Sequence, residues 1–115
     1  MEPELKAKIW IEAGGEKIFG DGPWDLLKRV ERTGSLRQAA AEIKMSYSQA
    51  WRLIRIIEQK LGYPLLEKRT GGSGGGYSKL TADAATLTTA YNRFRTDTEK
   101  AMKELFNLHL VNKIR

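Results

Sequence analysis

Apolar residues recur at helical spacing in three successive stretches of the first sixty residues. The first stretch begins at Asp21-Gly22-Pro23, since proline at the first helical position loses no needed hydrogen bond, and it ends at Gly34. The spacing predicts three amphipathic helices. Their apolar positions are, in chain order, Trp24, Leu26, Leu27 and Val30; Leu36, Ala39, Ala40 and Ile43; and Ala50, Ile54, Ile57 and Leu61.

Two capping signals divide the second and third stretches. Ser35 and Gln38, and again Ser46 and Gln49, have the S-x-x-Q spacing of a capping box, in which hydroxyl and side-chain amide satisfy backbone N–H groups at a helix start. Because Ser46 follows Ile43 by three residues, the third helix must start almost at once and at a large angle. This geometry is a helix-turn-helix over residues 35–62, with Gly62 as the C-terminal cap.

Two segments show strand signals instead. Leu5, Ala7, Ile9 and Ile11 alternate with mainly charged residues, which predicts a strand with one buried face and an N-terminal hairpin over residues 5–19. After Pro64, two short strands flank the glycine-rich run 71–76, so residues 64–80 are expected to form a wing with a flexible tip.

A long helix is predicted over residues 81–115, starting at the cap Thr81. One set of residues recurs there at strictly alternating spacings of four and three, which indicates a coiled-coil seam against a second copy of the chain. The expected homodimer contacts are Leu80, Ala84, Leu87, Tyr91, Phe94, Thr98, Ala101, Leu105 and Leu108.

These elements predict a mainly α fold with small β, a winged helix-turn-helix with an N-terminal β-hairpin and a long C-terminal dimerisation helix. The expected division is a DNA-binding domain over residues 1–80 and the dimerisation helix over 81–115. The chain's 115 residues suit one modest core plus an appendage.

The positive net charge of the chain indicates the chemical class of its binding partner. The chain has 20 Lys and Arg against 14 Asp and Glu, and between residues 23 and 79 the bases number eleven against five acids. The positive excess therefore lies on the predicted winged helix-turn-helix. This distribution favours double-stranded DNA as the partner over an acidic-substrate pocket.

Composition argues against several other classes. The sequence has no cysteine, no apolar run of membrane-spanning length and no signal-peptide pattern at its start, so a cytoplasmic protein is expected. The single histidine, His109, has no nucleophile motif or carboxylate cluster beside it in the sequence and is interpreted as a satisfied or solvent-facing side chain. We therefore expect no enzyme, no metal site and no cofactor.

Base reading is assigned to the outward face of the third helix, at Ser48, Gln49 and Arg52. Gln pairs with adenine and Arg with guanine in the major groove. The alternative is an ordinary solvated face, but the capped helix before it and the basic hairpin after it favour the reading role. Trp51 lies one step off the buried stripe and could pack in the core, cover the N-terminal hairpin or stack on a sugar, of which packing is favoured.

Phosphate contacts are expected from the two helix starts and the wing. Tyr47 is open to two interpretations, contact with phosphate or a thymine methyl, or only a staple for the helix end. The glycine run is not a P-loop, because Gly76 is followed by Tyr77 and a strand rather than by Gly-Lys-Ser/Thr and a helix. The full backbone-contact set is Ser35, Arg37, Gln38, Ser46, Tyr47, Arg55, Lys68, Arg69 and Lys79.

The segment from Ser35 to Thr81 resembles the N-terminal DNA-binding domain of the ModE family, molybdate-responsive transcriptional regulators of bacteria and archaea. It is more distantly similar to LysR-type winged helices. The resemblance rests on Ser46-Tyr47-Ser48-Gln49-Ala50-Trp51, on Arg69 through Gly76, and on Leu80-Thr81.

This resemblance implies a homodimer reading a palindromic operator, with half-sites about 34 Å apart. ModE proteins continue into oxyanion-binding domains, whereas this sequence ends at Arg115. The expectation is therefore a regulator without that sensing domain, served by a possible separate sensor protein. A protein-interaction adaptor and a small oxyanion sensor using the glycine loop are the alternatives.

Overall fold

A computed structural model describes residues 1–69 and 77–115, which divide into two units. One unit comprises Ile9–Thr88, and the other comprises Met1–Lys8 together with Thr89–Arg115. The glycine tip predicted at 71–76 lies outside the described residues, and so does the side chain of Arg69. Within the described ranges, no helix combines the length and apolar composition needed to cross a bilayer.

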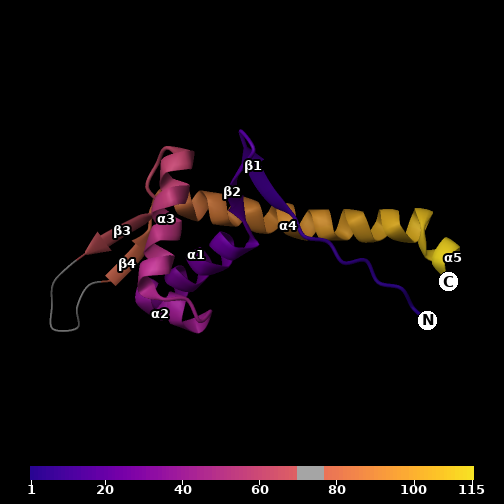
Figure 1. The fold of residues 1–115 in the computed structure, drawn as a ribbon, viewed down its shortest axis with the longest axis horizontal. Helices are drawn as coiled ribbons and strands as arrows, with labels where there is room; N and C mark the ends of the chain where they lie inside the picture. Colours follow the sequence, from indigo (N-terminus) through magenta and orange to yellow (C-terminus); the bar gives the residue numbers. More distant parts are fainter. Residues whose placement is uncertain (70–76) are drawn as a thin grey trace. The chain divides into compact units, whose positions relative to one another are not determined.

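The larger unit contains the predicted winged helix-turn-helix (Figure 1). Strands β1 (Trp10–Ala13) and β2 (Glu16–Gly20) pair antiparallel, and β3 (Leu66–Arg69) pairs antiparallel with β4 (Tyr77–Leu80). Between the two hairpins lie α1 (Asp21–Thr33), α2 (Leu36–Glu42) and α3 (Tyr47–Leu61). The predicted fold class is thus confirmed.

The core of this unit is built from the three predicted apolar stripes and the hairpin ends. Leu26, Leu27, Ala39, Ala50 and Ile54 are wholly buried. At the contact between α2 and α3 the residues are small, which allows their backbones to approach closely. This close approach orients α3 relative to the rest of the unit.

The capping box predicted at Ser46 is confirmed, whereas the one predicted at Ser35 is only half formed, because the Ser35 N–H donates to the Thr33 hydroxyl at 3.2 Å instead of to Gln38. Ser46 Oγ accepts from the Gln49 N–H at 3.1 Å, while the Ser46 N–H donates to Gln49 Oε1 at 3.0 Å, completing a capping box. Ser35 Oγ accepts from the Gln38 N–H at 3.0 Å. Gly34 and Gly62 end α1 and α3 in the left-handed conformation, with φ of 73° and 85°.

The N-terminal hairpin differs from its prediction. Strand pairing begins at Trp10 rather than at Leu5, and every residue of β1 is exposed. The expected buried face is absent from β1, and burial in the hairpin is confined to the end of β2, where Phe19 packs in the core. Pro23 is also the third residue of α1, not the first, a position where its missing N–H is equally harmless.

The wing is fixed to the helix-turn-helix by backbone bonds. The Ser78 N–H of β4 donates to the Gly34 carbonyl at 2.9 Å, directly before α2. The Thr81 hydroxyl donates to the Pro64 carbonyl at 2.8 Å and accepts from the Ala84 N–H at 3.0 Å, as its predicted capping role requires. The hairpin therefore has a defined position relative to α2.

Helix α4 (Ala82–His109) contributes its first turns to this unit, and the predicted seam divides accordingly. Leu80 and Ala84 are buried in the core of the chain itself, which leaves them little surface for a partner. Tyr91 is buried as well. Among the predicted seam positions, the later ones therefore keep more exposed surface.

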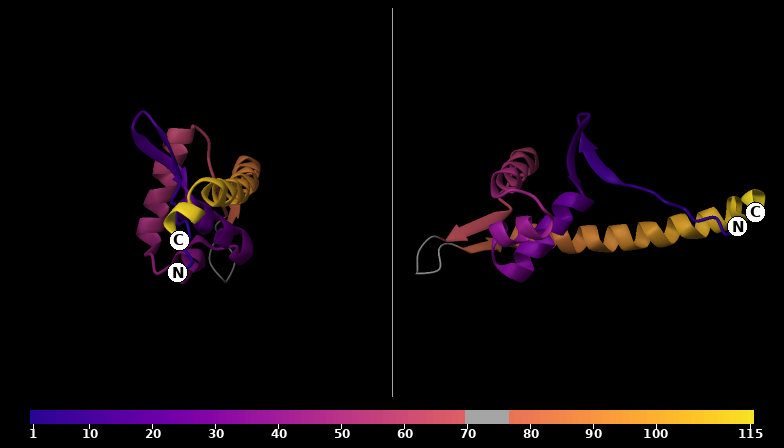
Figure 2. Two further views of the ribbon diagram at one scale, coloured as in Figure 1. Left: turned by 90° about the vertical axis from the view of Figure 1, so that its right-hand side faces the viewer. Right: turned by 60° about the horizontal axis from the view of Figure 1, so that its bottom comes forward.

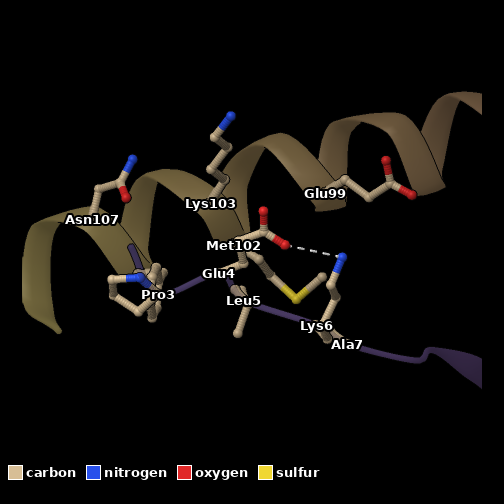
Figure 3. A pocket seen from close by; sticks show the side chains of 10 residues that line it. Pro3, Glu4, Leu5, Lys6, Ala7, Glu99, Met102, Lys103 and Asn107 are labelled. Carbon is tan, nitrogen blue, oxygen red and sulfur yellow. Dashed lines mark ion pairs between the residues drawn. The ribbon is translucent and has the colours of Figure 1, made fainter. Parts of the chain in front are cut away.

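The smaller unit consists of the N-terminal segment and the later turns of α4. Figure 2 shows the segment running along the far end of this helix. A groove of about 500 Å³ is lined by Pro3 and Leu5 on one side and by Met102 and Phe106 on the other (Figure 3). After His109 the helix predicted to reach 115 is interrupted, and α5 (Val111–Ile114) follows.

Several apolar side chains of α4 that do not line this groove are open to solvent. Phe94 is 50% exposed, Leu105 53% and Leu108 74%. Ala101 is exposed too, whereas Thr98 and Leu87 are partly buried. The exposed residues recur at the seam spacing, so they lie on one helix face.

The turn between α2 and α3 contains a strained residue. Lys44 has a φ of 58°, and Met45 N–H to Ala40 carbonyl and Lys44 N–H to Ala41 carbonyl bonds complete a Schellman motif. Glycine normally occupies this position, because a side chain there costs about 1 kcal/mol.

We predict that Lys44→Gly raises the free energy of unfolding by about 0.5 to 1 kcal/mol, the relieved strain being partly offset by a more flexible unfolded chain. Urea unfolding measures the change. Lys44→Ala is the matched control, because it removes the charge but keeps the β-carbon. Equal gains from both substitutions would show that charge, not backbone strain, is responsible.

Helices α1 and α2 are joined by an ion-pair cluster. Arg29 donates to Glu42 at 2.9 Å and to Asp25 at 3.1 Å, and Arg32 also bonds Glu42. The hydrogen bond from Arg29 holds the pKa of Glu42 below its ordinary value, with Arg32 adding to the effect.

A carboxyl whose pKa is lowered on folding contributes stability above its ordinary value and loses it as the pH falls. We therefore predict that the unfolding free energy decreases as pH drops below 4.5, and that Glu42→Gln flattens this decrease. Denaturant unfolding over an acid pH series checks this. In an Arg29→Met background, Glu42→Gln should have a smaller effect; parallel acid limbs in wild type and Glu42→Gln would contradict the assignment.

Candidate nucleic-acid interface

The outward face of α3 carries the predicted base-reading residues. Ser48, Gln49 and Arg52 are all exposed, as is Arg55 one turn beyond Arg52. The capping box engages Gln49 Oε1, which leaves its NH₂ group and a second lone pair of the oxygen for other partners. These groups include the donors and acceptors that base edges require, at the N-terminal end of an exposed helix.

Beside this face, aromatic rings and cations from three elements come together. Lys68 of β3 places Nζ 3.7 Å from the centroid of a Trp51 ring and donates to the Tyr47 hydroxyl at 2.6 Å. Arg37 of α2 lies over the Tyr47 ring at 4.3 Å, and Arg55 lies 5.5 Å from Trp51. These five residues are called the aromatic–cation cluster.

The spacing along α3 explains why the cluster forms. Tyr47 and Trp51 are four residues apart, so their rings lie on the same helix face, one turn from each other. The β3–β4 hairpin extends beside α3 (Figures 1 and 2), which brings the first basic residue of the wing over both rings. Helix α3 and the wing are thus in direct contact through Lys68, Tyr47 and Trp51.

The electrostatic consequence depends on what holds the cations. Arg29 and Arg32 face the carboxylate of Glu42, which compensates their charge. Arg37 and Lys68 instead contact ring faces and a hydroxyl, which attract a cation without neutralising it. The aromatic–cation cluster therefore presents net positive charge to solvent.

The other predicted backbone contacts lie at the starts of α2 and α3 and on α2, β3 and β4. Ser35 and Ser46 lie at the starts of α2 and α3, where their hydroxyl oxygens accept backbone N–H groups of Gln38 and Gln49. Gln38 and Lys79 are exposed. Arg69 is the last residue of β3, and only its backbone position is described.

Trp51 departs from its expected role. It is half-buried and serves as the platform for Lys68, whereas core packing had been favoured. Its spacing from Tyr47 was a usable signal in the sequence, but the approach of Lys68 depends on the position of the wing. Outside residues 70–76, the structure contains no group of three His, Cys, Asp or Glu residues arranged to hold a metal ion.

A second ionic contact fixes the opposite end of α3. Lys60 pairs with Glu16 of β2 at 2.9 Å and donates to the Lys17 carbonyl at 3.3 Å. The hydrogen bond from Lys60 lowers the pKa of Glu16. Helix α3 is thus contacted by the N-terminal hairpin at its end and by the wing at its beginning.

Comparison with known proteins gives a consistent family. The family model described as bacterial regulatory helix-turn-helix protein, lysR family, matches residues 24–85. The transcriptional regulator ModE of Haemophilus influenzae is 38% identical over 76 residues, covering 66% of this chain and 30% of that protein. The DNA-binding transcriptional dual regulator ModE of Escherichia coli strain K12 is 34% identical over 106 residues, covering 91% and 39%.

Solved structures share the fold. A crystal structure of the CbnR DNA-binding domain with DNA superposes with a TM-score of 0.58 at 20% identity, covering 76% of this chain and 94% of that one. The BenM DNA-binding domain in complex with benA site 1 DNA gives 0.57 at 17% identity, covering 77% and 94%.

These findings confirm the resemblance inferred from the motifs, although the chain spans only 30% and 39% of the length of the two ModE relatives. The matched range includes the whole helix-turn-helix, the wing and the start of α4. The chain therefore belongs to the LysR family of bacterial regulatory helix-turn-helix proteins, and it is similar to the transcriptional regulators named ModE.

Proposed function

We propose that the protein is a sequence-specific, DNA-binding transcriptional regulator that binds as a homodimer and catalyses no reaction. The observation that carries this proposal is the aromatic–cation cluster beside the exposed N-terminal half of α3. Its uncompensated cations suit a phosphate backbone, and the helix next to it suits a major groove. A bacterial regulator of this kind would act in the cytoplasm.

In this proposal Ser48, Gln49 and Arg52 read base edges. Backbone phosphates are contacted by the helix starts and the wing, from Ser35, Arg37, Gln38, Ser46, Tyr47, Arg55, Lys68, Arg69 and Lys79. Phosphate contacts supply affinity and register, while base contacts supply preference. The relatives named as ModE regulators support this division of roles by kinship alone.

The direct test is selection of preferred duplexes from a random-sequence pool, followed by binding measured over a salt series. We expect an enriched palindromic sequence and affinity that falls steeply with salt. Binding without sequence enrichment and without salt dependence would instead favour a protein-interaction module.

We predict that Arg52→Ala weakens binding to the selected duplex by about 1 to 3 kcal/mol, because a bidentate contact to one base is lost. Binding to a scrambled duplex should change much less. Fluorescence anisotropy on both duplexes gives the comparison. Lys28→Ala, which removes one positive charge from α1, is the matched control; equal Arg52→Ala losses on the two duplexes would contradict a base-reading role.

Dimerisation is assigned to the exposed part of the α4 seam, at Phe94, Ala101, Leu105 and Leu108, with Thr98 beside them. Exposed apolar side chains in a row on one helix face are typical of a helix–helix contact. A second copy would also place a second recognition helix on the duplex.

We predict that Phe94→Lys or Leu105→Lys yields monomers, since each would place a charge in the helix–helix contact. The affinity for the palindromic duplex should then fall sharply, because a monomer contacts only one half-site. Analytical ultracentrifugation measures the oligomeric state. Thr96→Lys adds the same charge two residues from Phe94, on another face of α4, and should leave the dimer intact. A dimer that survives both seam substitutions would point to another interface.

A further inference from the structure

The position of Lys68 is determined by two aromatic rings of another element. Its Nζ lies 3.7 Å from the centroid of a Trp51 ring and 5.1 Å from that of Tyr47, and it donates to the Tyr47 hydroxyl. A lysine side chain on an exposed strand normally samples many rotamers. Here the ammonium group is held over α3 before any ligand binds.

The direction of the hydrogen bond determines what this pair offers a ligand. An ammonium group has three donors and no acceptor, so the Tyr47 oxygen must accept from Lys68. The phenolic proton then points elsewhere and remains available for donation. One N–H of Lys68 faces the Tyr47 oxygen and another faces the Trp51 ring, so the third N–H and the O–H of Tyr47 are left to bind a ligand side by side, with Arg37 over the Tyr47 ring.

Such a group of donors fits one chemical class in a DNA duplex. A backbone phosphate shares one negative charge between two acceptor-only oxygens on the same phosphorus atom, so both donors can bind the same group. Base edges mix donors with acceptors and carry no net charge, which suits this arrangement less well. The Lys68–Tyr47 pair therefore suits a backbone phosphate better than a base edge.

We propose that Lys68 and Tyr47 form a two-donor clamp for a single backbone phosphate and that Trp51 is the positioning residue that holds Lys68 in place. This inference rests on the proposed DNA-binding function and deepens it. Because the clamp joins β3 to α3, the wing and the recognition helix dock together on the duplex. A lysine ordered in advance loses less conformational freedom on binding, so the contact is stronger.

The geometry is tested first in the free protein by NMR. Ring currents of Trp51 should shift the Lys68 side-chain methylene resonances upfield in wild type. Trp51→Leu should return them to ordinary positions, while Trp51→Phe, which keeps an aromatic face, should retain part of the shift. Unshifted Lys68 resonances in wild type would overturn the positioning role without reference to DNA.

Binding is then measured for a double-mutant cycle on the selected and scrambled duplexes. Trp51→Leu and Tyr47→Phe should each lower the affinity for both duplexes by about three- to tenfold. Lys68→Met should do the same and should also reduce the slope of log affinity against log salt by about one. In a Lys68→Met background, Trp51→Leu should cause no further loss. Trp51→Phe should restore most of the affinity, which keeps the test valid if Trp51→Leu folds poorly.

The outcomes separate the clamp from the proposed function. Additive losses of affinity from Trp51→Leu and Lys68→Met would show that Trp51 acts only through general stability. Losses confined to the selected duplex would show that these residues contact bases instead. Either result overturns the clamp but leaves the proposed DNA-binding function standing. A wild-type protein that binds neither duplex would overturn the proposed function, and the clamp with it.

Discussion

The close approach of α2 and α3 is the constraint on which the rest of this structure depends. Ala39, Ala40 and Ala50 are wholly buried, and the four-residue turn between the helices contains a left-handed Lys44. Small side chains allow the backbones to lie close together, and the turn sets their angle. Any larger residue at these positions would displace the helix that carries the candidate reading face.

Two further connections convert this helix pair into an interface. The backbone bond from Ser78 to Gly34 positions the wing beside the start of α2, and the contacts of Lys68 with Tyr47 and Trp51 join the wing to α3. Cations held by aromatic rings keep their charge, whereas those of α1 are compensated by Glu42. The distribution of partners, more than the number of bases, concentrates positive charge beside α3.

The apolar stripe of the long C-terminal helix includes both buried and exposed positions. Its first positions pack in the core of the larger unit, and several of its later ones remain exposed. A regular heptad pattern does not distinguish these cases, because an apolar side chain packs equally well on its own chain and on a partner. Only the exposed positions retain surface for a second copy.

The sequence by itself determined the helices, their caps and the wing, because periodicity and capping are local properties that residues a few positions apart decide. It also identified the family resemblance and the outward positions Ser48 and Arg52, which are exposed. The tertiary structure alone decided that β1 has no covered face, that Leu80 and Ala84 belong to the core, and that Trp51 supports Lys68. Each of these depends on which elements meet in space, and residues as distant in sequence as Trp51 and Lys68 meet only once the close-packed helix pair has positioned the wing.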